Sequence, residues 1–582
     1  MYFCVKTFPD EKFFSFGSAS NQKHAIVMEI QKLVKERVMI DLDGKLSEQE
    51  KRDYIRHAAD NLFVEAGAGA GKTTLLARRI INQIKNGEDP THFLIITFTD
   101  TAAQELHDKI MKHLSREIPK LDGATQALLI RTRDSIDTID ICTMQDFAEK
   151  ILHVYGGKGI RRKLTEYEAR TRRDRFFREW ASQHESEMAA VKDAMQALHC
   201  NTLLEAFRAI ADIHSEIITD AVPEDIMHPE DRLMALILKI RTDYLRYIAT
   251  DSNGVSKGQL LREAWQLMSM NPSVTADLRK HYTKIYYDEF QDTDSLQSRI
   301  IASIVLDASG RLRDNVLFLI GDEKQSIFRP YGAQVEIYQN VMKQMAAADN
   351  ANVLTLDGNF RSNPKIVTFV NKTFQKRIPG YKSMLPCQEG ASQFPLTGVY
   401  HYESTRKSMR DAENAAQLIG MILRAYSFLR YSDFLIIVKN PSHIGSFIDA
   451  LRHDHIPADG DMSHETVHVL DVHHVKGLSV NIVLVADRID PEETRYETLR
   501  IGNRCYPSFV VGRQLSGEML YPSYHRHPEL MALARSEEHA EWVRLEYVAA
   551  TRAKHALIFL PAMHKGAWFS DPAYQISSLP RL

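Results

Sequence analysis

The chain has 582 residues, 44% of them hydrophobic, so it is long enough for about three or four domains with sizeable cores. The formal net charge of −3 excludes a uniformly basic nucleic-acid-binding protein, so any contact with DNA must come from local patches. No apolar run reaches the length of a membrane span, and the N-terminus lacks the layout of a signal peptide, so we expect a soluble cytoplasmic protein. The absence of a CxxC pair argues against a disulfide framework, a zinc site or an iron–sulfur cluster; the five cysteines are Cys4, Cys142, Cys200, Cys387 and Cys505.

Residues 1–45 form an N-terminal extension with few clear signals. A helical pattern covers 24–37, and another helix is expected to start near residue 45, with Ser47 as its candidate N-cap. Gln49 in that helix carries an amide that offers both a donor and an acceptor, so it could bind the edge of an adenine base. A solvent-exposed helical glutamine is an equally good interpretation of this residue alone.

A glycine-rich bend follows the apolar run at 63–66 and precedes a helix-compatible run at 75–84. Small residues let backbone N–H groups turn inward around phosphates, and the next helix adds the positive end of its dipole. Lys72 would reach the β- and γ-phosphates, and the Thr73 hydroxyl would hold Mg²⁺. Ala66 stands where the strict motif has glycine, and a glycine-rich turn without a ligand is the alternative. The expected nucleotide-binding residues of the bend are Ala68, Gly69, Ala70, Gly71, Lys72, Thr73 and Thr74.

Strand and helix patterns then alternate. A buried strand is expected at 93–98, a helix at 101–114, and another change from strand to helix at 140–147. This alternation predicts a parallel α/β core, whose ligands bind at the carboxyl ends of the strands. Thr97 and Phe98 would lie at such an end.

The strand signals disappear from about residue 150 to residue 280, which predicts an all-helical insertion. Its expected helices cover 166–184, 187–199, 203–214, 231–249 and 257–270. The early part is rich in arginine and also contains Phe176 and Phe177, so it could bind a nucleic-acid backbone. A solvated helix face with internal ion pairs is at least as good an interpretation.

The α/β pattern resumes with a strand at 284–287 that ends in two acidic residues. Asp288 would hold Mg²⁺, and Glu289 would orient and deprotonate the attacking water. Acidic residues at strand ends also occur as ordinary surface groups, but a phosphate-binding bend in the same chain favours the catalytic interpretation. The next strand, at 316–320, leads to Gln325, which could sense the γ-phosphate.

A second α/β series follows. Arg361 stands just before a helix that begins near Pro364, a residue suited to a first helical turn. Helices are then expected at 412–426, 443–453 and 537–550, and strands at 434–438, 467–470, 482–486 and 556–560. Only about twenty residues follow the last strand, so we expect no fused nuclease domain after it.

Taken together and in this order, the motifs resemble those of superfamily 1 DNA helicases of the UvrD/Rep type, including helicase subunits of recombination nucleases. The resemblance covers residues 46–560, and each motif alone is modest evidence. The matching stretches are AGAGKT at 68–73, TFTDTAAQEL at 97–106, DEFQDT at 288–293, GDEKQSIF at 321–328, NFRS at 359–362, HHVKGL at 473–478 and YVAATRAK at 547–554.

The resemblance implies two RecA-like lobes with ATP and Mg²⁺ in the cleft between them. The first lobe would comprise 46–150 and 276–355, with the helical, 1B-like insertion at 151–275, and the second lobe 356–582. Arg361 and Arg552 match the arginines that clamp the γ-phosphate, beside the catalytic set Lys72, Asp288, Glu289 and Gln325. Gln49 and Phe360 match the positions that bind adenine. The expected DNA-binding residues are Thr97, Phe98, Thr143, Tyr331 and His473.

The chain also departs from the pattern of the family. Gln145-Asp146 replaces His-Ser, and Ser479 replaces a glutamate. The sequence at 330–333 has no aromatic-Arg-Gly-Ala, which moves or removes a base-stacking side chain. The helical 2B insertion that the family places in the second lobe is expected to be absent, because 456–460 leads almost directly to the strand at 467.

Three functions are compatible with these features. The first is a 3′–5′ single-stranded DNA translocase or helicase that acts on single-stranded or tailed duplex DNA in repair, recombination or antiviral (phage) defence. The second is a DNA-stimulated ATPase subunit that loads or regulates a separate nuclease, as in recombination complexes or complexes of the Gabija type. The third, a nucleotide-bound scaffold without motor activity, is disfavoured because Glu289, Arg361 and Arg552 are all present.

Overall fold

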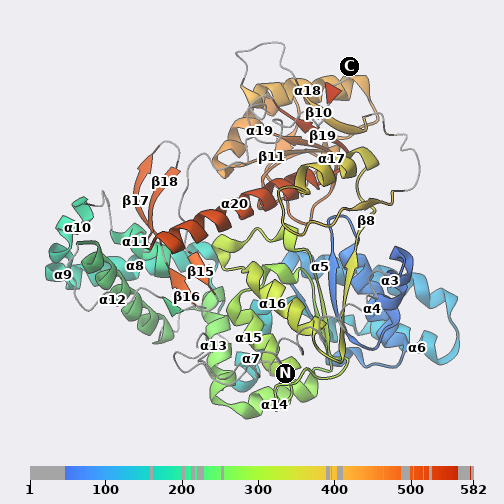
Figure 1. Cartoon of the computed structure of the whole chain (residues 1–582), viewed down its shortest axis with the longest axis horizontal. Coiled ribbons are helices and arrows are strands. Elements are labelled where there is room, and N and C mark those ends of the chain that lie inside the picture. Colours follow the sequence, from blue (N-terminus) through green and yellow to red (C-terminus); the bar gives the residue numbers. More distant parts are fainter. Residues whose placement is uncertain are drawn as a thin grey trace, which may run out of the picture.

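Figure 1 shows the computed structural model of the chain, in which two α/β lobes lie against each other and a long helix runs from one of them toward a separate helical region. The structure describes residues 46–157, 162–197, 203–211, 217–218, 229–250, 254–388, 394, 396–402, 410–462, 464–486, 499–501, 504–506, 508–514, 517–522, 527–560 and 577–578. The extension at 1–45, with its expected helix at 24–37, lies outside these residues. Within the described part, every helix is too short or too polar to cross a bilayer.

The first lobe is built on a six-stranded parallel sheet in the order β3-β2-β5-β6-β1-β7. Successive side chains of its strands enter opposite cores, because strand residues alternate between the two faces. Leu62 and Val64 belong to one core and Phe63 to the other. The strands are β1 (Asn61–Ala66), β2 (Phe93–Thr97), β3 (Asp140–Thr143), β5 (Lys284–Tyr287), β6 (Leu317–Gly321) and β7 (Ala351–Leu356).

Helices cover both faces of this sheet, which explains why its strands are apolar on both sides. One core takes side chains from α3 (Glu48–His57), α4 (Lys72–Lys85), α5 (Asp100–Glu117) and α6 (Gly123–Asp134). The other takes side chains from α7 (Met144–Tyr155), α13 (Lys257–Met270), α14 (Pro272–His281), α15 (Ser295–Val305) and α16 (Val335–Ala346). The predicted parallel α/β fold is confirmed.

A separate core lies in the helical region, where Phe177, Phe207 and Tyr244 are buried together. It is formed by α8 (Glu166–Gln183), α9 (Glu185–Ala190), α10 (Lys192–Ala197), α11 (Leu203–Ala211) and α12 (Pro229–Thr250). The expectation of an all-helical insertion is wrong at 217–218, which form a short strand. β4 (Ile217–Ile218) pairs with β16 (Arg504–Tyr506), and Cys505 of β16 is buried in this helical core. The pairing partner comes from a distant part of the chain, so no local pattern could predict it.

The second lobe is a seven-stranded parallel sheet in the order β12-β13-β11-β14-β19-β10-β20. Its strands are β10 (Gly398–His401), β11 (Phe434–Val438), β12 (Ala458–Asp459), β13 (Val467–Asp471), β14 (Val480–Val485), β19 (Ala553–Phe559) and β20 (Ser577–Ser578). Its helices are α17 (Pro364–Phe374), α18 (Asp411–Ala425), α19 (Ile444–His453) and α20 (Pro528–Ala550). In Figure 1, α20 runs from the second lobe toward the helical region.

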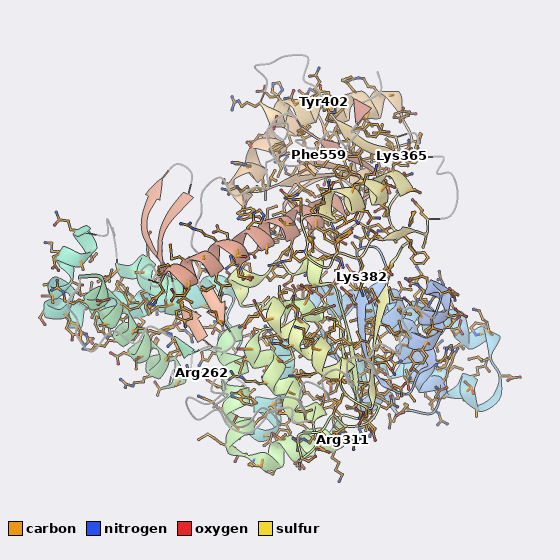
Figure 2. The ribbon with its side chains drawn as sticks, in the orientation of Figure 1. Arg262, Arg311, Lys365, Lys382, Tyr402 and Phe559 are labelled. Atoms are coloured by element: carbon orange, nitrogen blue, oxygen red, sulfur yellow. The ribbon has the colours of Figure 1, made fainter. Side chains whose placement is uncertain are left out.

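The described residues also form three small sheets. β8 (Gly358–Asn359) pairs with β9 (Leu385–Pro386), β15 (Leu499–Ile501) with β16, and β17 (Ser508–Gln514) with β18 (Gly517–Pro522). The two lobes also touch directly. Lys382, which Figure 2 places between them, donates from Nζ to Thr355 Oγ1 on β7 at 2.6 Å.

Candidate functional site

The glycine-rich bend lies between β1 and α4. Gly69 and Gly71 have φ angles of 75° and 76°, in the left-handed region that favours glycine. Lys72 is the first residue of α4, and Thr73 and Thr74 follow in its first turn. Ala66, by contrast, is the last residue of β1, and as a strand residue it does not need the conformational freedom of glycine. The departure from the strict motif therefore leaves the geometry of the bend unchanged.

Asp288 and Glu289 follow the carboxyl end of β5. Glu289 Oε1 lies 3.4 Å from Lys72 Nζ, and Glu289 adopts a left-handed backbone that is uncommon outside glycine. Desolvation and the adjacent Glu289 charge raise the pKa of Asp288 to about 7. Desolvation also opposes ionisation of Glu289, but the charges of Lys72 and Lys476 outweigh it and lower its pKa to about 2. The pKa values of the two neighbouring carboxyl groups are thus shifted in opposite directions, as in many catalytic pairs.

The second lobe faces this cluster with two arginines. Arg552 is fully buried; its Nη2 lies 3.3 Å from Oε1 of Gln325, and its Nε donates to the Val548 carbonyl. Arg361 Nη1 donates to the carbonyl of Thr551 at 2.9 Å. Burial, followed by repulsion from Arg361, lowers the pKa of Arg552 to about 9.

Both guanidinium groups lie within electrostatic range of Glu289, the carboxylate that also contacts Lys72. The expected catalytic side chains of the two lobes therefore converge on one place. Gln325 is held there by its own Nε2, which donates to Asp322 Oδ2 at 2.8 Å.

Asn359 brings the second lobe directly onto the bend. Its Nδ2 donates to the Ala68 carbonyl at 2.8 Å, and the Phe360 amide donates to the Gly69 carbonyl at 3.0 Å. A Cβ on Gly69 would lie 2.7 Å from Asn359 Nδ2, so only glycine allows this approach. The sequence alone assigns no role to Asn359, although this residue belongs to the motif at 359–362.

The expected adenine-binding residues lie on α3 and beside β8. Phe360 is 48% exposed, and the guanidinium of Arg52 lies 4.5 Å from its ring centroid. Arg52 also donates from Nη2 to the Ala70 carbonyl at 2.8 Å, which ties α3 to the phosphate-binding bend. Gln49 is exposed and donates to Asp53 Oδ2 at 3.2 Å. Arg52 is a further member of this region that no sequence motif indicates.

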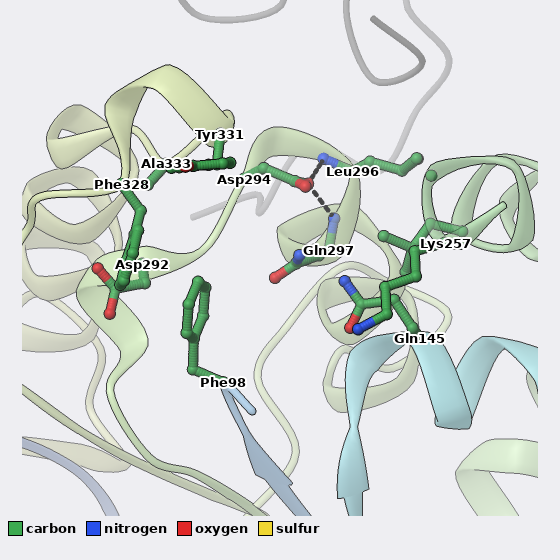
Figure 3. A pocket seen from close by; sticks show the side chains of 12 residues that line it. Phe98, Gln145, Lys257, Asp292, Asp294, Leu296, Gln297, Phe328, Tyr331 and Ala333 are labelled. Atoms are coloured by element: carbon green, nitrogen blue, oxygen red, sulfur yellow. Dashed lines mark hydrogen bonds between the residues drawn. The ribbon is translucent and has the colours of Figure 1, made fainter. Parts of the chain in front are cut away.

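Aromatic side chains line a pocket of about 280 Å³ beside the carboxyl end of β2 (Figure 3). Phe98 and Phe328 are stacked, with ring centroids 4.6 Å apart and an interplanar angle of 21°. Tyr331, 73% exposed, and His473 lie 5.9 and 6.4 Å from the Phe328 ring. The structure thus brings three expected DNA-binding residues together around Phe328, whose central position only the fold reveals. Lys257, at the start of α13, also lines the pocket.

Thr97 and Thr143 are placed differently from the aromatic residues. Both are buried, and the Thr97 hydroxyl donates to the Thr99 carbonyl at 3.1 Å. Thr143 is the N-cap of α7, and its hydroxyl donates to Asp146 Oδ2 at 2.7 Å in a capping box. Asp146 is one of the departures from the family pattern. Its carboxylate accepts the hydrogen bond of the Thr143 hydroxyl, the group that was expected to contact DNA. Asp146 also pairs with Lys163.

The arginine-rich start of the helical region agrees better with the ion-paired interpretation. Arg172 and Arg173 are buried, and Arg172 donates to the Gly254 carbonyl at 2.8 Å. Arg170 pairs with Glu166, one helical turn away. Phe176 packs against Tyr244, with ring centroids 5.3 Å apart, so its ring joins the helical core.

Comparison with protein families matches residues 47–346 to the UvrD/REP helicase N-terminal domain. A probable DNA helicase of Mycoplasma pneumoniae is 23% identical over 505 residues, which cover 85% of this chain and 80% of that protein. The ATP-dependent DNA helicase PcrA of Leuconostoc citreum is 23% identical over 74% of this chain and 52% of its own length. One subunit of an ATP-dependent helicase/nuclease from Levilactobacillus brevis is 21% identical over 62% of this chain and 42% of its own length.

The chain thus spans most of the Mycoplasma protein but only about half of the two other relatives. The family match covers more than half of the chain and includes the phosphate-binding bend, the acidic pair and Gln325. The chain belongs to the UvrD/REP helicase family.

Proposed function

We propose that this protein is an ATP-driven motor that moves 3′ to 5′ along single-stranded DNA and separates tailed duplexes. The observation that carries the proposal is the contact between Gln325 of the first lobe and Arg552 of the second, in a first lobe where Lys72 pairs with Glu289. Because these groups come from different lobes, binding and cleavage of a triphosphate between them would be coupled to lobe closure.

Thr73 and Asp288 are the residues that would hold Mg²⁺. Their oxygen atoms suit this cation, and the buried Asp288 carboxyl beside Glu289 is a place where a positive charge would be favourable. When bound, Mg²⁺ would neutralise phosphate charge and align the β- and γ-phosphates. Nucleotide contacts would come from the backbone of 68–74, with adenine between Gln49 and Phe360.

Glu289 would orient the attacking water through its carboxylate, because its lowered pKa keeps it ionised at neutral pH. Lys72 would bind the terminal phosphates, and Gln325 would sense the γ-phosphate. Arg361 and Arg552 would stabilise the charge that develops in the transition state, a contribution of roughly 10³–10⁵ in rate for an arginine of this kind.

The stacked aromatic residues around Phe328 would form the track for single-stranded DNA. Base stacking on such rings contributes roughly 1–3 kcal/mol per base and tolerates any sequence. The rings come from both lobes: Phe98 and Tyr331 from the first and His473 from the second. A DNA strand bound there would therefore be displaced when the lobes move relative to one another.

A second candidate is an ATPase component that loads or regulates a separate nuclease. Two observations favour it. Only residues 460–466 separate β12 from β13, where the family usually inserts the 2B domain that engages duplex DNA. Two of the similar proteins are named as subunits of an ATP-dependent helicase/nuclease. Repair, recombination and antiviral defence are the settings in which either activity would be used.

The test is ATP hydrolysis by the full chain with and without oligo-dT, together with Glu289→Gln. We expect single-stranded DNA to raise the rate, and the variant to bind ATP but lose turnover. Stimulation by DNA without separation of a 3′-tailed duplex would support the regulatory role instead, and a wild-type rate that DNA does not change would contradict both candidates. Equal inactivity of wild type and variant would contradict both candidates. A 3′-tailed duplex then separates a helicase from a translocase that does not unwind.

A further inference from the structure

The loop at 325–331 connects the candidate ATP site with the aromatic pocket. It begins with Gln325, whose Oε1 lies 3.3 Å from the Nη2 of Arg552, and it carries Phe328 and Tyr331 at its other end. A rigid displacement of this loop would therefore move both the candidate γ-phosphate sensor and the stacking rings.

This loop comes from the first lobe but is fastened to α20 of the second. Arg544 Nε donates to the Ser326 carbonyl at 2.7 Å, and both residues are buried. Arg329 Nε lies 2.7 Å from Glu541 Oε2, and these side chains are only 12% and 7% exposed. Between these two contacts, Ile327 is fully buried in the hydrophobic core of the second lobe.

The helix itself is anchored in the second lobe. Tyr547 and Val548 belong to the same core as Ile327, Glu546 pairs with Arg377 of the α17 region, and the ammonium of Lys439 lies 4.7 Å from the Trp542 ring centroid. An α-helix is stiff along its axis, so Glu541, Arg544 and the arginine that follows its C-terminus should move as one body.

We propose that Glu541 and Arg544 are positioning residues that hold the 325–331 loop in register with Arg552, so that nucleotide binding changes the affinity for single-stranded DNA. This inference rests on the proposed function and deepens it. Neither residue is among those that line the aromatic pocket, and each acts through the loop. Arg500 adds a further contact, because its Nη1 donates to the Arg329 carbonyl at 3.0 Å.

The test measures linkage between the two ligands. The dissociation constant of fluorescein-labelled oligo-dT is determined by anisotropy without nucleotide and with a non-hydrolysable ATP analogue, and the ratio of the two constants reports the coupling. We expect a wild-type ratio that differs from one by about fivefold or more. Glu541→Gln and Arg544→Lys should bring the ratio close to one and leave ATP hydrolysis without DNA within about twofold of wild type.

Two controls separate positioning from loss of folding. Glu529→Gln makes the same chemical change at an exposed position of α20 and should keep the wild-type ratio. The double variant Arg329→Glu with Glu541→Arg restores the ion pair with the two charges exchanged. Its ratio of dissociation constants should return most of the way from the Glu541→Gln value to the wild-type value. Thermal melting of each variant identifies any that does not fold, and Arg329→Gln then replaces it, because this change leaves α20 intact.

Three outcomes would count against the inference. Wild-type ratios in folded Glu541→Gln and Arg544→Lys would overturn it, as would a loss of DNA-independent ATP hydrolysis equal to the loss of coupling. Failure of the wild type to bind oligo-dT would contradict the proposed function, and the inference with it. The first two outcomes, obtained with a wild type that binds oligo-dT, would contradict the inference alone.

Discussion

Arg552 of the second lobe donates from Nη2 to Oε1 of Gln325 in the first lobe at 3.3 Å, and both side chains are buried. The residues around Gln325 and Arg552 in the sequence do not indicate that these two side chains meet, because 227 positions separate them. It joins the side chain expected to sense the γ-phosphate to an arginine expected to stabilise it. The candidate active site is therefore an interface between two lobes, and its activity should depend on groups from each.

Replacement of Arg552 by lysine should remove most of the catalysis. Lysine keeps the charge but cannot bridge Gln325 and the Val548 and Leu478 carbonyls at once, because it lacks the planar fork of donors. We expect kcat for ATP hydrolysis to fall by roughly 10³-fold or more with a much smaller change in ATP affinity. Steady-state kinetics and binding of a fluorescent ATP analogue measure the two effects. Arg424→Lys, at an exposed site, is the matched control, and a similar fall in both variants would contradict the assignment.

Gly69→Ala should weaken ATP binding. The added Cβ would lie 2.7 Å from the Asn359 amide and 2.9 Å from Arg361 Cβ, and the residue has a positive φ. Gly87→Ala provides the comparison, because Gly87 also has a positive φ but a Cβ there would meet no other described atom within 4 Å. Backbone strain of about 1–3 kcal/mol should lower the stability of both variants. Only Gly69→Ala should raise the KM for ATP, and equal KM values would show that the close approach is unimportant.

Phe98→Ala and Phe328→Ala should each reduce affinity for single-stranded DNA. The two rings are stacked on one another and line the same pocket, so either truncation removes one surface and unsettles the other. The expected loss is roughly 1–3 kcal/mol, or about five- to 150-fold in the dissociation constant, with ATP hydrolysis in the absence of DNA unchanged. Phe428→Ala removes an exposed ring elsewhere and serves as the control. Anisotropy titrations with oligo-dT at fixed salt would detect the difference, and wild-type affinity in both pocket variants would refute the proposed track.

Asp288→Asn should stabilise the nucleotide-free protein, and more so at alkaline pH. Burial and the Glu289 charge raise the pKa of Asp288 to about 7, so the folded protein retains this proton at a pH where the unfolded chain has lost it. The free energy of unfolding contributed by this group therefore falls as the pH rises from about 4 to about 7.

Asparagine cannot ionise, so it removes that loss. We expect Asp288→Asn to gain roughly 1–3 kcal/mol relative to wild type at about pH 8 and much less at about pH 5. Urea unfolding without Mg²⁺ or nucleotide measures the difference, with the exposed Asp134→Asn as the control. An equal effect of Asp288→Asn at both pH values would show that ionisation of this group is not responsible.

Local sequence determined the parts of this protein whose geometry is set by neighbouring residues. The phosphate-binding bend is contiguous, and its two left-handed positions are both glycine. The sequence at 68–74 therefore indicated the backbone conformation of the bend. Apolar runs in alternation with helical segments predicted both parallel sheets, because a strand covered on both faces must be apolar throughout. The family resemblance then linked motifs that are far apart along the chain.

Only the tertiary structure decided how distant segments meet. Thr143 was expected to face DNA, but Asp146 caps the same helix and takes its hydroxyl, a choice that depends on side-chain geometry. Cys505 lies in the second half of the chain and is nevertheless buried in the helical core, because its strand β16 pairs with β4 of the helical region. The contacts that join Gln325 to Arg552 form between surfaces of two lobes. Local propensity leaves such contacts open, since they depend on the packing of whole lobes.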